Sequence, residues 1–280
     1  MTERDEHLAF ALRLADTAGA VVRSYYRSTL MVESKADASP VTVADREAEQ
    51  ALRAMIRAAY PDHGIEGEEY PGAGPFVPSP PSLDACRLAV QACRGCDLFR
   101  DATQAVFGEG RDGARMVLVG EQPGDREDLA GHPFVGPAGR LLDDALEAAG
   151  VARDDVYLTN AVKHFRHEGT RGKQRIHKSP ARWQVAACQP WLLTELDAVR
   201  PAVVILLGAT AGQAIYGPTF RVGATRGTAV PWPTDRLSLA EPPVCVPTVH
   251  PSAVLRSRTR DADFAALVAD LDVAAGLAQR

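Results

Sequence analysis

Apolar residues follow two different spacings along the chain. Over residues 6–30 they recur every three to four positions, which predicts an amphipathic helix. A second helix is predicted to begin near Thr42, whose hydroxyl can cap it together with Asp45, and to stop at Pro61. The N-terminal part is therefore predicted to be a small helical segment.

After residue 82 the pattern changes to short buried strands that alternate with helices. This alternation predicts an α/β fold with a central, mostly parallel four-stranded sheet and helices on both faces, in three layers. In such sheets, ligands bind at the carboxyl ends of the strands. The predicted strands are 116–120, 156–160, 203–208 and 244–249, and the predicted helices are 137–150, 180–199, 209–216 and 261–278.

A segment rich in proline and glycine, PGAGPFVPSPP, separates the two patterns. Such a composition is typical of a linker. We therefore expect a helical segment at residues 1–70, a linker at 71–82 and a larger domain at 83–280.

The net charge of −5 comes from the N-terminal part of the chain. Residues 1–80 carry eight Lys or Arg and thirteen Asp or Glu, so the remainder is neutral overall. A nucleic-acid site therefore has to form by local clustering beyond residue 80. No apolar run approaches the ~18 residues of a membrane span, and the N-terminus has no signal-peptide pattern, so we expect a cytoplasmic protein without a membrane partner.

One local cluster of positive charge is prominent. Residues 163–182 contain seven Lys or Arg and one acid, Glu168, and the segment 172–180 within them has the composition of a loop. A phosphodiester backbone is the first anion to consider for such a loop, and a solvated surface loop is the alternative. His177 lies between the cations, whose charge lowers its proton affinity and favours a neutral, nucleophilic imidazole.

Polar residues follow three of the predicted strands. They are Glu121 with Gln122, then Asn160, then His250, and Phe134 adds an aromatic plane in the next turn. Each has an ordinary structural alternative as a turn, cap or core residue. Because parallel strands end at one edge, these side chains are expected to meet there.

The five cysteines do not suggest a disulfide framework, because an odd number in a cytosolic chain argues against one. Cys93 and Cys96 form a C-x-x-C pair, which alone is compatible with redox chemistry, metal binding or chance.

Together these residues resemble the uracil-DNA glycosylase superfamily. The runs GEQPGD, PFVGPAGRLL, LTNAVKHF and HPSAVLR occur in the family's order and spacing, and the resemblance covers residues 83–278. It is closest to the iron–sulfur, family 4-like branch and, within that branch, to the UdgX type. The mark of that type is an inserted loop with a K-R-R-I-H motif, which here reads K-Q-R-I-H over residues 173–177, with Gln174 in the place of an Arg.

The resemblance implies a role for each matching residue. Catalysis falls to Glu121, His177 and His250; uracil binding to Gly120, Gln122, Phe134 and Asn160; DNA contacts to Lys173, Gln174, Arg175, Lys178, Ser252, Leu255 and Arg256; and a [4Fe–4S] cluster to Cys93, Cys96, His164 and Cys188.

The implied reaction is the excision of uracil from DNA, preferably single-stranded, with free uracil as a product. In the UdgX type, the loop histidine attacks the sugar C1′ and stays attached, which gives a covalent protein–DNA adduct. A conventional multi-turnover uracil-DNA glycosylase is the alternative. A second alternative is a single-stranded DNA-binding module without chemistry. We expect a monomer that associates with the DNA of a bacterial nucleoid.

The N-terminal segment resembles a different family. The runs KADASPVTVAD at 35–45 and PDHGIEGEE at 61–69 resemble the start of inositol-monophosphatase-like and histidinol-phosphatase-like enzymes, with Glu68 at a magnesium-ligand position and Asp45 nearby. The next motif of that family, D-P-x-D-G-T, is absent. A magnesium ion needs several oxygen ligands, so we interpret residues 1–70 as a truncated phosphatase segment.

Overall fold

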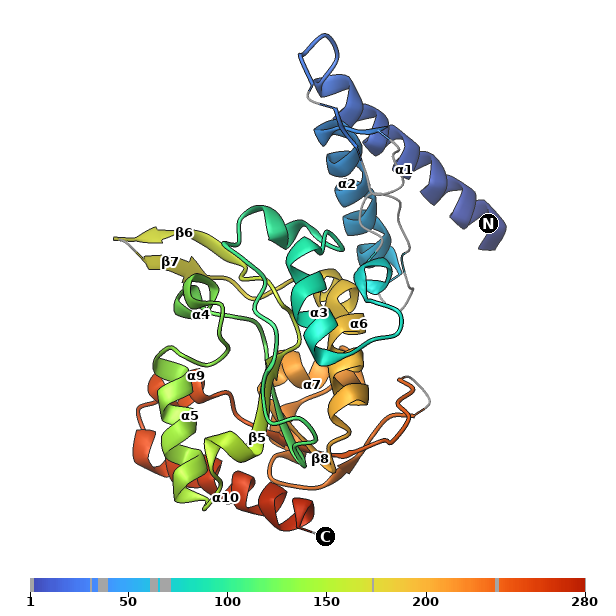
Figure 1. The fold of residues 1–280 in the computed structure, drawn as a ribbon. Helices are drawn as coiled ribbons and strands as arrows, with labels where there is room; N and C mark the ends of the chain where they lie inside the picture. The colour runs from blue at the N-terminus through green and yellow to red at the C-terminus, as the bar shows by residue number, and fades with distance from the viewer. Residues whose placement is uncertain are drawn as a thin grey trace. The chain divides into compact units, whose positions relative to one another are not determined.

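The structure, a computed structural model, describes residues 3–30, 32–34, 40–60, 65, 72–172, 174–234 and 237–279 (Figure 1). The chain divides into two compact units, Met1–Pro71 and Gly72–Arg280. No helix in the described ranges combines the length and the apolar character needed to cross a membrane.

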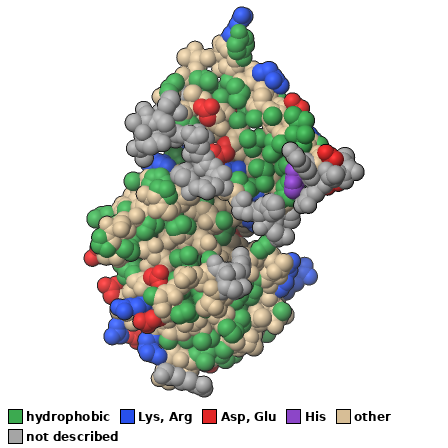
Figure 2. All heavy atoms as spheres, turned by 90° about the vertical axis from the view of Figure 1, so that its right-hand side faces the viewer, with side chains coloured by type: hydrophobic (Ala, Val, Ile, Leu, Met, Phe, Trp, Pro, Cys, Tyr) green, Lys and Arg blue, Asp and Glu red, His purple; other side chains and the backbone are tan. Residues whose placement is uncertain are grey.

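The N-terminal unit is built from two helices, α1 (Glu3–Ser24) and α2 (Val43–Ala59), and a short ribbon of β1 (Glu33–Ser34) and β2 (Pro40–Val41). The predicted cap of α2 is confirmed: the Asp45 carboxylate accepts the Thr42 N–H at 2.8 Å, and the Thr42 hydroxyl accepts the Asp45 N–H at 3.4 Å. Leu8, Leu12 and Val22 remain exposed along α1. Figure 2 shows apolar side chains interspersed with charged ones on the face that it draws.

The C-terminal unit is organised around a six-stranded sheet with the order β3-β5-β4-β8-β10-β9. Its four inner strands are parallel and match the predicted ones. The two edge strands are antiparallel and were not predicted, because a two-residue strand carries no periodicity. The strands are β3 (Glu109–Gly110), β4 (Met116–Gly120), β5 (Val156–Asn160), β8 (Val203–Leu207), β9 (Val230–Pro231) and β10 (Val244–Thr248).

Helices cover both faces of this sheet, which confirms the three-layer prediction (Figure 1). Strand β8 shows the reason, because Val204 and Leu206 enter one core while Ile205 enters the other. One core packs α3 (Leu83–Ala89), α6 (Arg182–Val199) and α7 (Ala209–Tyr216), and the other packs α5 (Pro137–Ala148), α9 (Pro251–Leu255) and α10 (Arg260–Ala278). The short helices are α4 (Asp125–Ala130) and α8 (Val222–Thr225), with 3-10 turns at Gly74–Phe76, Val90–Ala92, Asp97–Arg100 and Arg153–Asp155.

The start of the proline-rich segment packs on the C-terminal unit. The Gly72 N–H donates to the Gly95 carbonyl at 3.2 Å, and the Ala73 N–H donates to the Ala187 carbonyl at 2.7 Å. Phe76 also packs against the core of that unit. The first half of the stretch expected to be a linker therefore packs on this unit, where Phe76 and Val77 are partly buried.

The basic segment is a β-hairpin, so the expectation of an irregular loop was wrong. Strand β6 (His167–Arg171) pairs antiparallel with β7 (Gln174–His177), and His167 lies opposite His177. Gly172 has a φ of 65°, which supplies the turn. The hairpin closes where the Lys178 N–H donates to the Arg166 carbonyl at 3.0 Å, and Figure 1 shows it beside α4.

Candidate active site

Glu121, Asn160 and His250 lie at the carboxyl ends of the central strands. Gly120 and Asn160 are paired in register at the ends of β4 and β5. Strand β10 ends two residues before His250, and β8 joins that end through the Gly208 N–H, which donates to the Thr248 carbonyl at 2.9 Å. The carboxyl ends of the parallel strands therefore hold Glu121, Asn160 and His250 together.

Gly120, Phe134 and Asn160 form a tightly packed floor. A Cβ atom at Gly120 would lie 2.3 Å from Asn160 Oδ1 and 2.8 Å from Phe134 Cζ, so only glycine fits. Phe134 has a φ of 57°, which is uncommon for a residue with a side chain. Backbone strain of this kind is frequent at functional sites, where the surrounding structure enforces it.

The imidazole of His250 is neutral and its tautomer follows from its contacts. Burial, aided by the charges of His177 and Arg256, lowers the pKa of His250 to about 4. Its Nδ1 accepts the Ser252 N–H at 3.1 Å, so the proton resides on Nε2. The ring lies 6.4 Å from that of Phe134, with an interplanar angle of 27°. His250 thus offers a neutral N–H donor beside the floor.

Glu121 has one occupied and one available carboxylate oxygen. Its Oε2 accepts a hydrogen bond from the Thr210 hydroxyl. Its Oε1 is buried, has no hydrogen-bond partner among the described residues, and lies 3.3 Å from Nε2 of His177. A buried carboxylate oxygen in this state is suited to a developing positive charge or a water molecule.

Gln122 clamps the base of the hairpin. Its Nε2 donates to the carbonyls of Arg166 and Lys178, each at 3.1 Å, and its Oε1 accepts the Arg166 N–H at 3.0 Å. The amide is therefore satisfied within the protein. A contact between Gln122 and uracil stays a prediction, and the clamp is a role that the sequence did not reveal.

Arg175 fixes the hairpin to the turn that follows β4. Its Nε donates to Asp125 Oδ1 at 2.6 Å, and its Nη2 lies 2.8 Å from Oδ2 of the fully buried Asp128. The contacts thus direct this guanidinium to carboxylates, and a contact between Arg175 and DNA stays a prediction. Asp125 and Asp128 lie in α4, close to the basic hairpin. These two acids are the signal in the sequence that could have indicated ion pairs with Arg175.

The positive charge of residues 163–182 is smaller than the sequence suggests. Lys163 pairs with Glu195, Arg175 with the two aspartates, and Lys178 with Glu168. Three of the seven cations are therefore neutralised internally. An anion site on this segment stays a prediction.

The buried ring of Phe165 lies beneath the hairpin. The His177 ring is 6.1 Å from it, the His167 ring is 5.3 Å from it, and the Arg175 guanidinium carbon is 5.3 Å from its centroid. The imidazole of His177 is half-exposed. One aromatic ring thus supports both the anchor and the candidate nucleophile.

The other predicted DNA-contacting residues are more scattered. Gln174 and Arg256 are exposed, Leu255 packs partly against the core, and the Ser252 hydroxyl lies 2.8 Å from Nδ1 of His250. Lys173 lies outside the described residues.

The predicted cluster ligands are compatible with an iron–sulfur cluster. Cys93, Cys96 and Cys188 are buried as free thiols that influence one another electrostatically. Burial lowers the pKa of His164 to about 4, which leaves a neutral imidazole. Within the described ranges no three such side chains converge as a single metal ion would require. A [4Fe–4S] cluster does not need that convergence, because each ligand binds a different iron.

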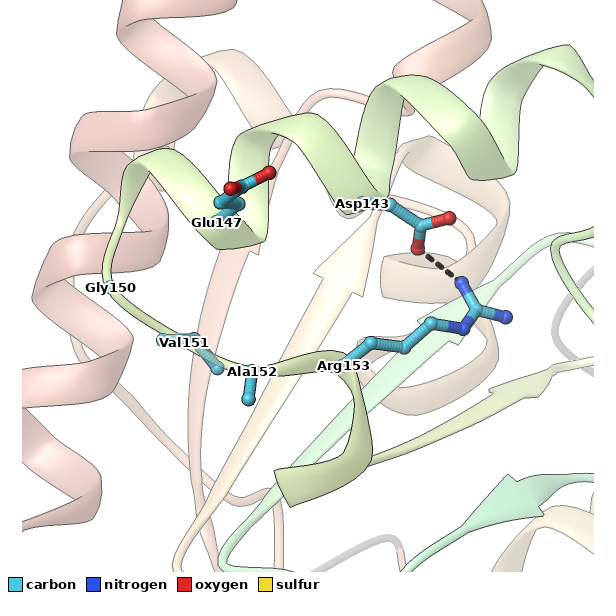
Figure 3. Close-up of a pocket in the computed structure, with 6 residues that line it drawn as sticks. All are labelled: Asp143, Glu147, Gly150, Val151, Ala152 and Arg153. Atoms are coloured by element: carbon cyan, nitrogen blue, oxygen red, sulfur yellow. Dashed lines mark hydrogen bonds and ion pairs between the residues drawn. The ribbon is translucent and has the colours of Figure 1, made fainter.

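A surface pocket lies at the opposite end of β5 (Figure 3). Residues 150–153, which line it, precede that strand, whereas Asn160 ends it. Arg153 donates to Asp143 at its rim. None of the predicted site residues lines this pocket, so we do not assign it to the reaction.

Comparison with known proteins agrees with this fold. The sequence profile of the Uracil DNA glycosylase superfamily matches residues 107–272, and the chain therefore belongs to that superfamily. Within it, the chain is 36% identical over 172 residues to a type-4 uracil-DNA glycosylase of Thermotoga maritima, covering 61% of this chain and 82% of that protein. A type-4 uracil-DNA glycosylase of Archaeoglobus fulgidus is 40% identical over 135 residues, 48% of this chain and 64% of that protein.

The N-terminal unit matches a different family. The Inositol monophosphatase family profile matches residues 3–82. A histidinol-phosphatase of Chlorobaculum parvum is 48% identical over 64 residues, which are 22% of this chain and 25% of that protein. The chain thus holds a quarter of the length of this phosphatase relative. Of the two residues predicted near a magnesium ion, Asp45 is committed to the cap of α2, and Glu68 lies outside the described residues.

Proposed function

We propose that this chain recognises uracil in DNA, preferably single-stranded, and cleaves its N-glycosidic bond. The observation that carries the proposal is the neutral His250 imidazole beside Phe134, Asn160 and Glu121 at one sheet edge. Extruding a base from a stack costs a few kcal/mol, and the cost is least in a single strand.

Base recognition falls to the floor of the site. The extruded uracil stacks on Phe134, and the Asn160 amide offers one donor and one acceptor to the base edge. Gly120 allows the backbone to approach closely, because a side chain there would collide with both residues.

Bond cleavage places negative charge on uracil and positive charge on the sugar. The His250 Nε2–H donates to the uracil oxygen that gains charge; a donor of this kind typically contributes about 10²–10³ to the rate. The bonding pair leaves with N1 of uracil while C1′ becomes oxocarbenium-like. Glu121 Oε1 stabilises that cation and accepts a proton from the water that adds to C1′.

The test is release of base from matched oligonucleotides. The chain is incubated with single strands that carry one uracil or one thymine, and free base and alkali-labile sites are measured. We expect release from the uracil strand only. If the chain bound both strands equally, released no base, and lost this binding in SDS, the DNA-binding module would be favoured instead.

A second candidate function is covalent capture of the sugar by His177. The observation that favours it is the distance of 3.3 Å between Nε2 of His177 and Oε1 of Glu121. Here Nε2 forms the bond to C1′, uracil leaves with the electron pair, and the Nδ1 proton passes to solvent. The relatives are named as glycosylases, so the comparisons support the turnover reaction more directly.

Capture is tested on a denaturing gel. A uracil-bearing strand is expected to give a protein–DNA band that survives boiling in SDS, whereas a thymine-bearing strand gives none. Catalytic release of uracil without such a band would exclude covalent capture and leave the hydrolytic reaction.

A further inference from the structure

A fully buried ion pair lies between the base-reading end of the sheet and the cysteine-rich region. The side chains of Lys163, which follows β5, and Glu195, on α6, both have an exposure of 0%. Burying two charges costs several kcal/mol per ion, and hydrophobic residues of similar volume often replace such pairs without loss. Its presence at this place therefore calls for an explanation beyond packing.

The ammonium group of Lys163 holds the residue that is proposed to read uracil. Its Nζ donates to the backbone carbonyl of Asn160 at 2.8 Å, to the Thr159 hydroxyl at 2.8 Å, and to Glu195. These three acceptors use all three of its protons. A charged donor thus fixes the backbone of Asn160, and charged donors are stronger than neutral ones.

The carboxylate of Glu195 joins this grip to the surrounding core. It accepts the Gly108 N–H at 2.8 Å, the Tyr157 hydroxyl at 3.1 Å and the Thr159 hydroxyl at 2.9 Å. Among the described residues, no buried polar side-chain atom of this network lacks a hydrogen-bond partner. Such networks rigidify the segments that they connect.

The same lysine contacts a predicted cluster ligand. Its backbone N–H donates to Sγ of Cys188 at 3.3 Å. Hydrogen bonds to cysteine sulfur and nearby net charge are among the factors that set the potential of an iron–sulfur cluster.

We propose that Lys163 and Glu195 form one positioning element that holds Asn160 for uracil recognition and sets the charge beside Cys188. The inference rests on the proposed function and on the predicted cluster. It adds that one pair of residues supports both the uracil-reading Asn160 and the cluster ligand Cys188. Recognition of uracil and the potential of the cluster should therefore both respond when this pair is changed.

The first test removes both charges in the full-length protein with Lys163→Met/Glu195→Gln, which keeps the volumes and leaves Glu195 an acceptor. We expect wild-type cluster absorbance near 400 nm, a midpoint potential shifted to more negative values, and a KM for uracil-bearing single strands raised about tenfold with little change in kcat. Tyr157→Phe is the control, because it removes one hydrogen bond to Glu195 and leaves the Lys163–Asn160 contact.

A second variant removes one charge only and predicts the opposite sign, whereas the volume-matched double variant is the one expected to keep the fold. Glu195→Gln alone keeps the ammonium group and removes its counter-charge, so the midpoint potential is expected to shift in the opposite direction, to more positive values. If the pair had only a structural role, the variants would lose the cluster and the fold together. The shift of the midpoint potential would then not change sign between the two variants.

The outcomes separate this inference from the proposed function. A wild-type protein that releases no uracil contradicts the function, and one without cluster absorbance contradicts the cluster and with it the shared support. An active, cluster-containing wild type whose variants keep the same KM and midpoint potential overturns the role of Lys163 and Glu195.

Discussion

Nε2 of His177 lies 3.3 Å from Oε1 of Glu121, although one residue belongs to a hairpin and the other to the turn after β4. The Gln122 amide and the Arg175 anchor hold the hairpin in this place. An imidazole therefore lies next to the carboxylate proposed to stabilise the sugar cation, where it can compete with water.

Replacing His177 by Ser should remove the covalent adduct and leave uracil release intact, because water then reaches C1′. Adduct is measured on SDS gels and free uracil by chromatography. His167→Gln is the matched control, since His167 lies opposite His177 and against the same Phe165 ring. An undiminished adduct in His177→Ser would mean that another residue is the nucleophile.

Arg175→Met should lower adduct yield more than uracil release, because the hairpin loses its attachment to Asp128. Breaking a buried pair by removing one partner typically costs about 3–5 kcal/mol. Arg111→Met is the control, as its pair with Asp155 is exposed, lies outside the predicted site and is worth about 0–1 kcal/mol. The measurements are single-turnover adduct yield and melting temperature. Equal effects of the two variants would argue against the anchor.

The four inner strands and the helices α5, α6, α7 and α10 could be predicted because their periodicity is strong. The buried run at β8 and the glycine that ends α5 allow few other structures. The edge strand β3 could not be predicted, since its two residues pair with β5 only through the tertiary fold. Element type thus followed from local pattern, and the sheet edges did not.

The site was predictable in its location and less so in its contacts. Strand ends placed Glu121, Asn160 and His250 together, as parallel-sheet geometry requires. The partners of Gln122 and Arg175 depend on how the hairpin folds back on the sheet, and a charge count does not show this. A basic segment can direct its cations inward as well as toward a ligand.

The low pKa of His250 predicts how stability depends on pH. The folded-state pKa is about 4 and that of the unfolded chain is near 6.5, so the unfolded state binds more protons between these values. The stabilising contribution is complete above about pH 6.5 and is lost as pH falls toward 4. The slope for one such group is up to about 1.4 kcal/mol per pH unit.

This dependence is measured by denaturant unfolding between pH 4.5 and 7. The free energy of unfolding should depend less steeply on pH in His250→Gln than in the wild type, because the variant lacks the imidazole. The other titrating groups are shared by both proteins. The variant should also lose about 10²–10³ in the rate of uracil release. A wild-type curve with the same slope as that of His250→Gln would contradict a buried neutral imidazole.

The predicted cluster can be tested with cysteine variants. Cys96→Ser or Cys188→Ser should abolish the absorbance near 400 nm and lower the melting temperature, because an iron–sulfur cluster needs its thiolates. Cys86→Ser and Cys245→Ser are the controls, since both thiols are equally buried but lie outside the predicted ligand set. If the Cys86 variant lost the absorbance instead, Cys86 would take the place of one of the predicted ligands.

Asp45 is predicted to act as a helix cap and not as a metal ligand. Its carboxylate accepts hydrogen bonds from the N–H and the hydroxyl of Thr42, each at 2.8 Å, at the start of α2. Asp45→Ala should therefore weaken α2 by about 1 kcal/mol, which corresponds to about fivefold faster hydrogen exchange of its amides. Asp16→Ala, an exposed change within α1, is the control.

The same exchange measurement separates the cap from a metal site. Millimolar Mg²⁺ should leave the exchange of the α2 amides unchanged in both the wild type and Asp45→Ala, and the full chain should release no phosphate from histidinol phosphate. A metal ligand would behave differently, because binding to the folded state adds stability in proportion to ion occupancy. Protection that rises with Mg²⁺ in the wild type and not in Asp45→Ala would restore Asp45 to the metal site of the phosphatase family.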